Sequence, residues 1–150
     1  MSFLLTYSVD GPPVAWARAG RNKYTGRTFT KCRQGRAMTA HQLASKTAMK
    51  AAGLAMIPKG TPAHILVIAR FALPASLSDA QRSARLMGAG YHTQAPDGSN
   101  ILKLIEDSLN GLAYYDDSQI ASATVSKCWA VAGLGKTTVT ITSPLAGPGV

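Results

Sequence analysis

The chain contains one long apolar run, Ala63-His64-Ile65-Leu66-Val67-Ile68-Ala69-Arg70-Phe71-Ala72-Leu73. Its β-branched and aromatic residues favour a buried β-strand over a helix. Pro74 ends the run, because proline cannot donate to a strand ladder. Residues 58–62, which contain two prolines and a glycine, form a predicted turn before it. The other elements are predicted outward from this strand.

Helices are predicted on both sides of the strand. Residues 37–52 are rich in alanine, which has the highest helix propensity, and Gly53 is a suitable stop. In residues 99–110, leucines and isoleucines recur on one face at helical spacing. A shorter helix is predicted over residues 78–87, with Ser78 as its N-cap.

Three further strands complete the predicted sheet. Residues 3–9 form the first of them, and a Gly-Pro-Pro sequence ends it. Residues 120–131 and 137–142 form the last two. The glycine-containing segment 132–135 is expected to join these two as an antiparallel hairpin.

These elements predict an α+β (mixed α/β) fold. The chain has 150 residues, a length that fits one domain. We expect a single small domain over residues 1–142, with a mixed sheet of about four strands packed against two main helices. Half of the remaining residues, 143–150, are Gly or Pro, so we expect a flexible C-terminal tail there.

Composition favours a cytoplasmic protein with no membrane partner. No apolar stretch approaches the roughly 18 residues of a membrane span. No Lys or Arg precedes the first apolar run, which argues against a secretory signal. Cys32 and Cys128 lie far apart and have no metal-binding spacing, so we expect two ordinary thiols in a reducing compartment.

The chain is basic, with 16 Lys and Arg residues against 7 Asp and Glu residues and a formal charge of +9. Such a charge favours a polyanionic partner such as nucleic acid. Many of the cations lie in residues 14–36, which contain no acid and are predicted to form a loop or an irregular hairpin. Tyr24 and Phe29 lie among them and either stack on bases or sugars or pin the loop to the core. The cations expected to hold a nucleic-acid backbone are Arg18, Arg21, Lys23, Arg27, Lys31 and Arg33.

The acids are gathered elsewhere, because five of the seven fall within residues 97–117. Asp97 precedes the predicted helix at 99–110, and Asp116-Asp117 follow it after a short turn, so a chain that folds back could bring them close. Carboxylate oxygens suit Mg²⁺, and a bound metal can polarise a phosphodiester and lower the pKa of an attacking water. Lys103, on the polar face of the helix, could stabilise charge that develops on the phosphate.

Simpler interpretations of the same residues stay open at this point. Asp97 or Ser99 can be an ordinary N-cap. Lys103 and Asp107 have the spacing of a solvated surface pair, and Asp116-Asp117 is a common turn sequence. A single histidine such as His92 more often packs or lies in solvent than binds a metal.

Three segments resemble the motifs of the RusA family of Holliday junction resolvases: Pro96-Asp97-Gly98-Ser99-Asn100-Ile101-Leu102-Lys103, Asp107-Ser108-Leu109-Asn110-Gly111 and Tyr115-Asp116-Asp117-Ser118-Gln119-Ile120. The family pattern runs Pro-Asp-x-Asp-Asn, a Lys three residues after that Asn, Asp-Ala-Leu-Asn-Gly and Asp-Asp-x-Gln. The resemblance is strongest over about residues 92–120 and extends more weakly over most of the chain.

The resemblance implies a RusA-like homodimer that binds four-way DNA junctions and cuts symmetrically related phosphodiesters with Mg²⁺ or Mn²⁺ in recombination and repair. It also suggests a bacterial, phage or prophage origin. The implied catalytic residues are Asp97, Lys103 and Asp117, and the implied metal ligands are Asp97, Ser99, Asp117 and Asp116, with Asn100 and His92 as supporting motif residues.

Ser99 departs from the family pattern, which has an aspartate at that position. A neutral hydroxyl is a poorer ligand for a hard cation, and it repels DNA phosphate less, so junction binding could survive without cleavage. Three explanations are open: a natural site rearranged to use Asp116 or a water, a natural junction-binding member with weak or no cleavage, or a sequence altered to trap an inactive state. A further alternative is a general single-strand or RNA-binding module, which would not prefer branched DNA over linear duplex.

Overall fold

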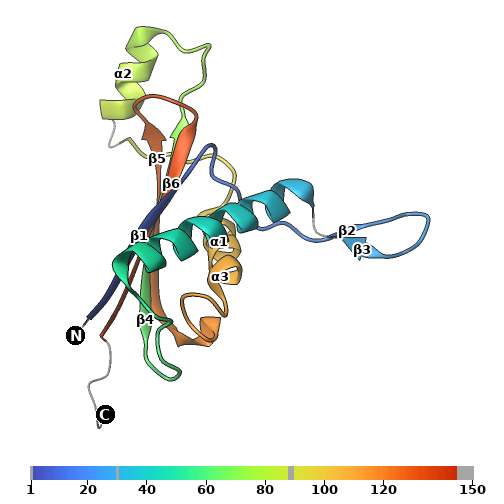
Figure 1. The fold of residues 1–150 in the computed structure, drawn as a ribbon. Coiled ribbons are helices and arrows are strands. Elements are labelled where there is room, and N and C mark those ends of the chain that lie inside the picture. The colour runs from blue at the N-terminus through green and yellow to red at the C-terminus, as the bar shows by residue number, and fades with distance from the viewer. Residues whose placement is uncertain (1, 30, 88–89, 145–150) are drawn as a thin grey trace.

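The computed structural model describes residues 2–29, 31–87 and 90–144, and its centre is a four-stranded mixed sheet of order β1-β6-β4-β5 (Figure 1). Strand β6 is antiparallel to both β1 and β4, whereas β5 is parallel to β4. The strands are β1 Ser2–Asp10, β4 Ala63–Ala72, β5 Ile120–Ala130 and β6 Gly135–Pro144. The predicted α+β class and mixed four-stranded sheet are confirmed.

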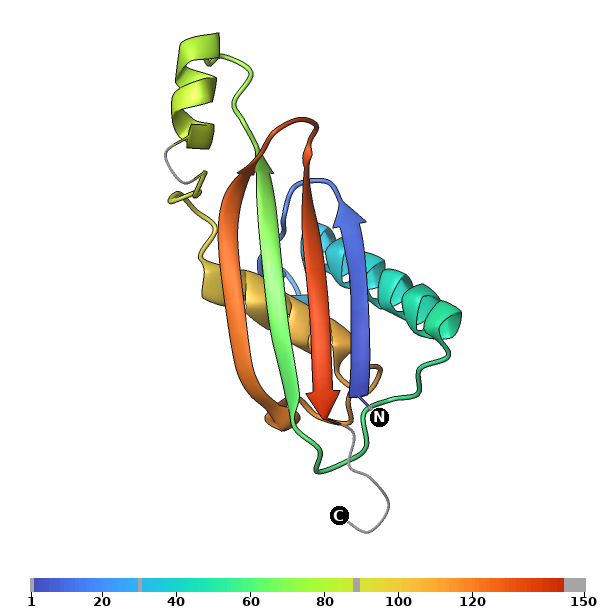
Figure 2. The ribbon, with the colours of Figure 1, turned by 90° about the vertical axis from the view of Figure 1, so that its left-hand side faces the viewer.

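The two main helices, α1 (Cys32–Ala52) and α3 (Gly98–Leu109), cover one face of this sheet (Figure 2). Alternate residues of β1, β4 and β6 are buried toward them. Between the sheet and the helices lies the apolar core, which includes Phe3, Leu5, Ile65, Val67, Ile101, Leu104, Ile105, Leu109, Val139 and Ile141. This packing fixes the outward face of α3, which carries the predicted catalytic lysine.

Helix α1 begins at Cys32, earlier than the predicted residue 37, and ends as predicted at Gly53. The earlier start has a tertiary cause: Gln34 is buried, and its Oε1 accepts a hydrogen bond from the N–H of Ala17 at 3.0 Å. Arg33 therefore lies on a helix rather than in the predicted loop.

The predicted hairpin between the last two strands is wrong. Strand β4 lies between β5 and β6 and pairs with both of them, so residues 131–134 cross the end of β4. Gly135, at φ +103°, makes this crossing possible, because a Cβ there would lie 2.5 Å from the carbonyl oxygen of Arg70. The most apolar strand thereby gains a partner on each side.

The short helix α2 (Asp79–Met87) forms beyond the end of β4 and begins after Ser78, as predicted. The Ser78 Oγ accepts a hydrogen bond from the Gln81 N–H at 3.2 Å, and the Gln81 Oε1 accepts one from the Ser78 N–H at 2.9 Å. This pair of bonds is a capping box, which fixes the start of the helix. Within the described residues, no helix is both long and apolar enough to cross a membrane.

The end of β6 lies beyond residue 142. Ser143 is buried, and its Oγ donates a hydrogen bond to the carbonyl of Pro62 at 2.6 Å. Ser143 and Pro144 therefore belong to the sheet and not to the predicted tail. The rest of that tail, residues 145–150, lies outside the described residues.

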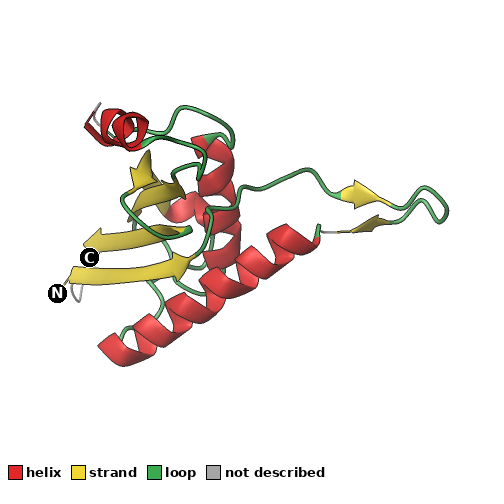
Figure 3. Cartoon of the chain, turned by 90° about the horizontal axis from the view of Figure 1, so that it is seen from above, coloured by secondary structure: helices red, strands yellow, loops and turns green. Residues whose placement is uncertain are grey.

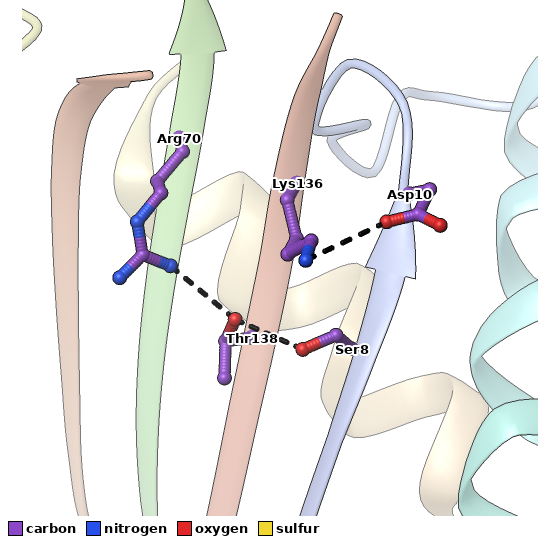
Figure 4. A network of polar contacts seen from close by, with 5 residues as sticks. All are labelled: Ser8, Asp10, Arg70, Lys136 and Thr138. Atoms are coloured by element: carbon purple, nitrogen blue, oxygen red, sulfur yellow. Dashed lines mark hydrogen bonds and ion pairs between the residues drawn. The ribbon is translucent and has the colours of Figure 1, made fainter. Parts of the chain in front are cut away.

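The second face of the sheet carries a polar network in place of a helix layer (Figure 4). The Thr138 Oγ1 lies 3.1 Å from the Ser8 Oγ and accepts a hydrogen bond from the Arg70 Nη1 at 3.3 Å. Nearby, the Lys136 Nζ lies 3.8 Å from the Asp10 Oδ1. The predicted catalytic residues on α3 thus lie on the opposite, helical side of the sheet.

Residues 14–31 contain the predicted irregular hairpin. Strands β2 (Gly20–Arg21) and β3 (Thr28–Phe29) pair with each other and form an arm that projects from the body of the molecule (Figure 3). Thr30 and the side chain of Phe29 lie outside the described residues.

Candidate active site and nucleic-acid interface

Asp97 occupies the N-cap position of α3, but its side chain makes no capping hydrogen bond. Its carbonyl oxygen accepts the bonds from the N–H groups of Asn100 and Ile101, both at 3.1 Å. The exposed carboxylate is therefore not used to cap the N-terminus of the helix, and it is available to a cation or a substrate.

The approach to Asp97 is held by Lys127 of β5. The Lys127 Nζ donates hydrogen bonds to the carbonyl oxygens of Gln94 at 2.5 Å and Pro96 at 2.8 Å. Gly98 lies directly against β5, because a Cβ there would be 3.5 Å from the Val125 side chain. The sheet thus positions both sides of the Asp97 backbone.

Ser99 and Lys103 are exposed and lie one turn apart on α3. The Lys103 Nζ lies 4.4 Å from the centroid of the Trp16 ring, a cation–π contact. The Trp16 N–H donates a hydrogen bond to the Asn100 carbonyl at 2.8 Å. The predicted surface pair with Asp107 does not form an ion pair within the described residues. Trp16 orients the lysine instead, and no local sequence pattern indicates that contact.

The acidic turn, Tyr115–Gln119, follows α3 and contains the short 3₁₀ helix η1 (Asp117–Gln119). Asp116 is the N-cap of η1, and its Oδ2 accepts a hydrogen bond from the Ser118 N–H at 3.2 Å. Hydrogen bonds from Ser118 lower the pKa of the Asp116 carboxyl below its ordinary value. Asp116 therefore has a structural task, and Asp117 is the freer carboxylate of the pair.

Gln119 anchors the acidic turn to the body of the molecule. Its Oε1 accepts hydrogen bonds from the N–H groups of Tyr115 at 2.9 Å and Asp116 at 3.2 Å. Its Nε2 donates to the carbonyl oxygens of Pro58 at 2.8 Å and Thr61 at 2.9 Å. These four bonds give a physical reason for the glutamine in the Asp-Asp-x-Gln motif.

Asp117 lies within electrostatic reach of α3. Burial raises the pKa of the Glu106 carboxyl above its ordinary value, and the nearby negative charges of Asp117 and Asp107 raise it further. The positive charge of Lys103 acts in the opposite direction. Glu106 therefore belongs to the same electrostatic group as Lys103 and Asp117.

In the part of the chain that the structure describes, the acidic side chains of residues 97–117 do not form one compact metal-binding cluster. The 12 residues of α3 span roughly 18 Å, and Asp97 lies before the first turn whereas Asp117 acts on Glu106 in the third. Within the described residues, no three His, Cys, Asp or Glu side chains lie close enough to hold a metal ion together. The donors present fit Mg²⁺ through one or two carboxylates, with water and substrate phosphate completing its shell. The metal ligands Asp97, Ser99, Asp116 and Asp117 stay a prediction.

His92 packs between the ends of β4 and β5. Its ring stacks on Phe71, with centroids 3.8 Å apart, and meets Trp129 at 4.6 Å with an interplanar angle of 62°. Burial lowers the pKa of His92, and the charges of Lys127 and Arg85 lower it further. The neutral ring thus supports the start of the loop that leads to Asp97.

The base of the arm lies beside the Asp97 loop. Lys31, Arg33 and Trp16 line a hollow of about 280 Å³ together with Pro96. Within the described residues, the six cations predicted to bind DNA are exposed and form no ion pairs. The positive charge of Lys31 and Arg33 is therefore available to a polyanion next to the predicted catalytic motif, and the other four cations precede them in residues 18–27.

A comparison with protein families agrees with the motif resemblance. The family described as endodeoxyribonuclease RusA matches residues 10–142. A search of curated proteins finds no match to the sequence. The family match includes the arm, α3 and the acidic turn, and covers most of the chain. The chain therefore belongs to the RusA family of endodeoxyribonucleases, which are Holliday junction resolvases.

Proposed function

We propose that this protein binds four-way DNA junctions as a homodimer and cleaves them with Mg²⁺ or Mn²⁺. One observation carries the proposal: the free carboxylate of Asp97 and the oriented ammonium of Lys103 lie at the start of α3, beside the cations at the base of the arm. Anion-binding groups and a cation ligand thus occupy one side of the molecule.

Each of these residues has a distinct task in the proposed reaction. Asp97, with the Ser99 hydroxyl beside it, would hold the divalent ion at the start of α3. Asp117, which acts on the third turn of the helix, stays a predicted ligand. When bound, that ion supplies polarisation of the phosphodiester and a water of lowered pKa. Lys103, held against Trp16, stabilises negative charge on the phosphate in the transition state.

DNA recognition in this proposal rests on backbone contacts. The six cations of the arm and of the start of α1 neutralise phosphates, and such contacts position a protein on DNA without selecting a sequence. A twofold-symmetric homodimer suits a junction because the two cut strands are equivalent. We place this action in the cytoplasm, in DNA recombination and repair; family members occur in bacteria and phages.

A second candidate function is junction binding with weak or no cleavage. Ser99 stands where the family motif has an aspartate. Within the described residues, Asp97 does not belong to any group of three His, Cys, Asp or Glu side chains that could compensate for the missing carboxylate. Loss of one carboxylate weakens affinity for a hard cation. It leaves the phosphate-binding cations unchanged.

Cleavage of a labelled four-way junction, with and without Mg²⁺ or Mn²⁺, tests the proposal. We expect paired nicks in symmetrical strands that require the metal. Asp97→Asn should lower the cleavage rate at least about 100-fold, because metal catalysis contributes several kcal/mol. The variant should unfold like the unmodified protein, since the Asp97 side chain makes no hydrogen bond to α3. Cleavage that persists in EDTA would refute the proposal.

Ser99→Asp separates the two candidate functions in the same assay. A rate increase of more than about tenfold over the unmodified protein, at equal or lower junction affinity, favours the binding protein with a weakened site. Metal-dependent cleavage by the unmodified protein that is as fast as cleavage by Ser99→Asp favours an active enzyme that works with Ser99.

A further inference from the structure

The tip of the arm has a defined shape, which a single asparagine holds. The Asn22 Oδ1 accepts hydrogen bonds from the N–H groups of Tyr24 at 2.8 Å and Thr25 at 3.0 Å. The Asn22 N–H donates to the Arg27 carbonyl, and the Gly26 N–H donates to the Asn22 carbonyl, both at 2.8 Å. Gly26 has φ +72°, in the left-handed region that favours glycine. The turn is therefore formed in the free protein.

Tyr24 is displayed at this tip. Its side chain is 86% exposed, the largest fraction among the large hydrophobic side chains that the structure describes. The Lys23 Nζ lies 5.2 Å from the ring centroid and holds a cation near the ring. Of the two interpretations of Tyr24 in the sequence, pinning the arm to the core is thus wrong, and the ring is available to a partner.

The charges around Tyr24 indicate the nature of that partner. Arg21, Lys23 and Arg27 lie in the same turn, and no acid occurs between Asp10 and Asp79. The Arg21 Nε donates a hydrogen bond to the Gly26 carbonyl at 3.2 Å, which ties its guanidinium to the turn. An exposed ring among cations is the arrangement by which proteins stack on unpaired bases while neutralising the backbone.

The reach of the arm determines where such a base can lie. Tyr24 lies seven positions along the chain from Ala17, at the base of the arm, and this stretch spans at most roughly 25 Å when extended. That length exceeds the roughly 12 Å width of a major groove. Chain length therefore does not prevent Tyr24 from contacting, across a groove, DNA that lies at Asp97 and Lys103. A continuous duplex keeps its base faces stacked, whereas a branch point can expose them.

We infer that Tyr24 stacks on an unstacked base at the branch point and thereby makes the arm the element that distinguishes branched from linear DNA. The inference rests on the proposed function and deepens it. The phosphate contacts hold any DNA, and this one aromatic contact requires an open base face.

The test uses the full chain in EDTA with two DNAs of matched sequence, a four-way junction and a linear duplex. The junction carries 2-aminopurine at the branch point, whose fluorescence reports stacking. We expect Tyr24→Ala to lower the preference for junction over duplex roughly tenfold and to abolish the fluorescence change on binding. Tyr24→Phe, which keeps the ring, should retain both properties. Tyr91→Ala, which removes another exposed tyrosine at 61% exposure, is the matched control and should also retain both.

The outcomes separate this inference from the proposed function. If Tyr24→Ala keeps the full preference and the fluorescence change, the stacking role is overturned and junction binding stands. If Tyr24→Ala weakens binding to both DNAs equally, the role is overturned as well, because the contact is then not selective. If the unmodified protein binds linear duplex as tightly as the junction, the proposed function fails and this inference fails with it.

Discussion

Two turns of this molecule are each held by one amide side chain, and they differ in what that side chain is bonded to. Gln119 joins the acidic turn to backbone carbonyls of the segment before β4, so the turn has a fixed place relative to the body. Asn22 bonds only within the tip of the arm, so the arm has a fixed shape and is joined to the body by its two chain segments. Catalytic side chains need a fixed position, whereas side chains that bind the backbone of a large polyanion can change their orientation and still bind.

The largest expected effect is on stability, and it distinguishes the two amides directly. Gln119→Ala should lower the free energy of unfolding by about 2–4 kcal/mol, since its four hydrogen bonds, three of them exposed, contribute about 0.5–1 kcal/mol each. Asn22→Ala should change it by less than about 0.5 kcal/mol, because it lies on the surface of a projecting arm. Urea unfolding measures both values. An Asn22→Ala protein as unstable as Gln119→Ala would show that the arm is part of the cooperative fold.

A smaller effect concerns the salt dependence of DNA binding. The double variant Arg21→Ala with Arg27→Ala should reduce the slope of log K against log salt concentration by about 2, close to 0.9 per lost phosphate contact. Lys46→Ala with Lys50→Ala removes the same charge from the other end of α1 and should leave the slope unchanged. Equal reductions in the two double variants would mean that total charge, rather than the arm, holds DNA.

The smallest expected effect is the pH dependence of two carboxyl groups, which have opposite signs. The pKa of Glu106 is raised above its ordinary 4.5, so this group destabilises the fold increasingly as pH rises through the raised value. The pKa of Asp116 is lowered below 3.8, so its stabilising contribution is lost as pH falls toward the lowered value.

At pH values above the raised pKa of Glu106, the Glu106→Gln variant should therefore melt at a higher temperature than the unmodified protein. Asp116→Asn should lose less stability on acidification. Thermal melts between about pH 3 and pH 8 show both effects, which solvent screening keeps small. Shifts of the same sign at neutral pH in both variants would contradict the assigned environments.

The strands and helices could be predicted where the hydrophobic period is clear, as in β4 and α3. The order of the strands in the sheet could not be predicted. The Gly-rich turn after β5 specifies that the chain reverses, but not which strand lies next to β5. Insertion of β4 between β5 and β6 follows from packing over the whole sheet. The early start of α1 could not be predicted either, since it depends on a hydrogen bond that the Gln34 side chain accepts from a residue seventeen positions away.

Of the site, the sequence could indicate the segments but not their supports. The motif pattern located Asp97, Lys103 and the acidic turn, whose roles in catalysis stay predictions. The contacts of Trp16 with Lys103 and of Lys127 with the Asp97 loop join residues distant in the chain. Such contacts use a ring face or a backbone carbonyl and leave no local pattern. The electrostatic link between Asp117 and Glu106 could not be predicted either, because the two residues lie eleven positions apart and only the folded chain brings them close.

The position of β6 in the sheet also has a consequence for biosynthesis. β1 pairs only with β6, and β4 pairs with β5 and β6, so the last strand of the described chain joins two otherwise separate parts. On the ribosome, β1 emerges first and has no strand partner until residues 135–144 leave the exit tunnel. A translation product that stops before residue 135 would carry the arm, every acid of the site and both β4 and β5, but its β1 would have no strand partner.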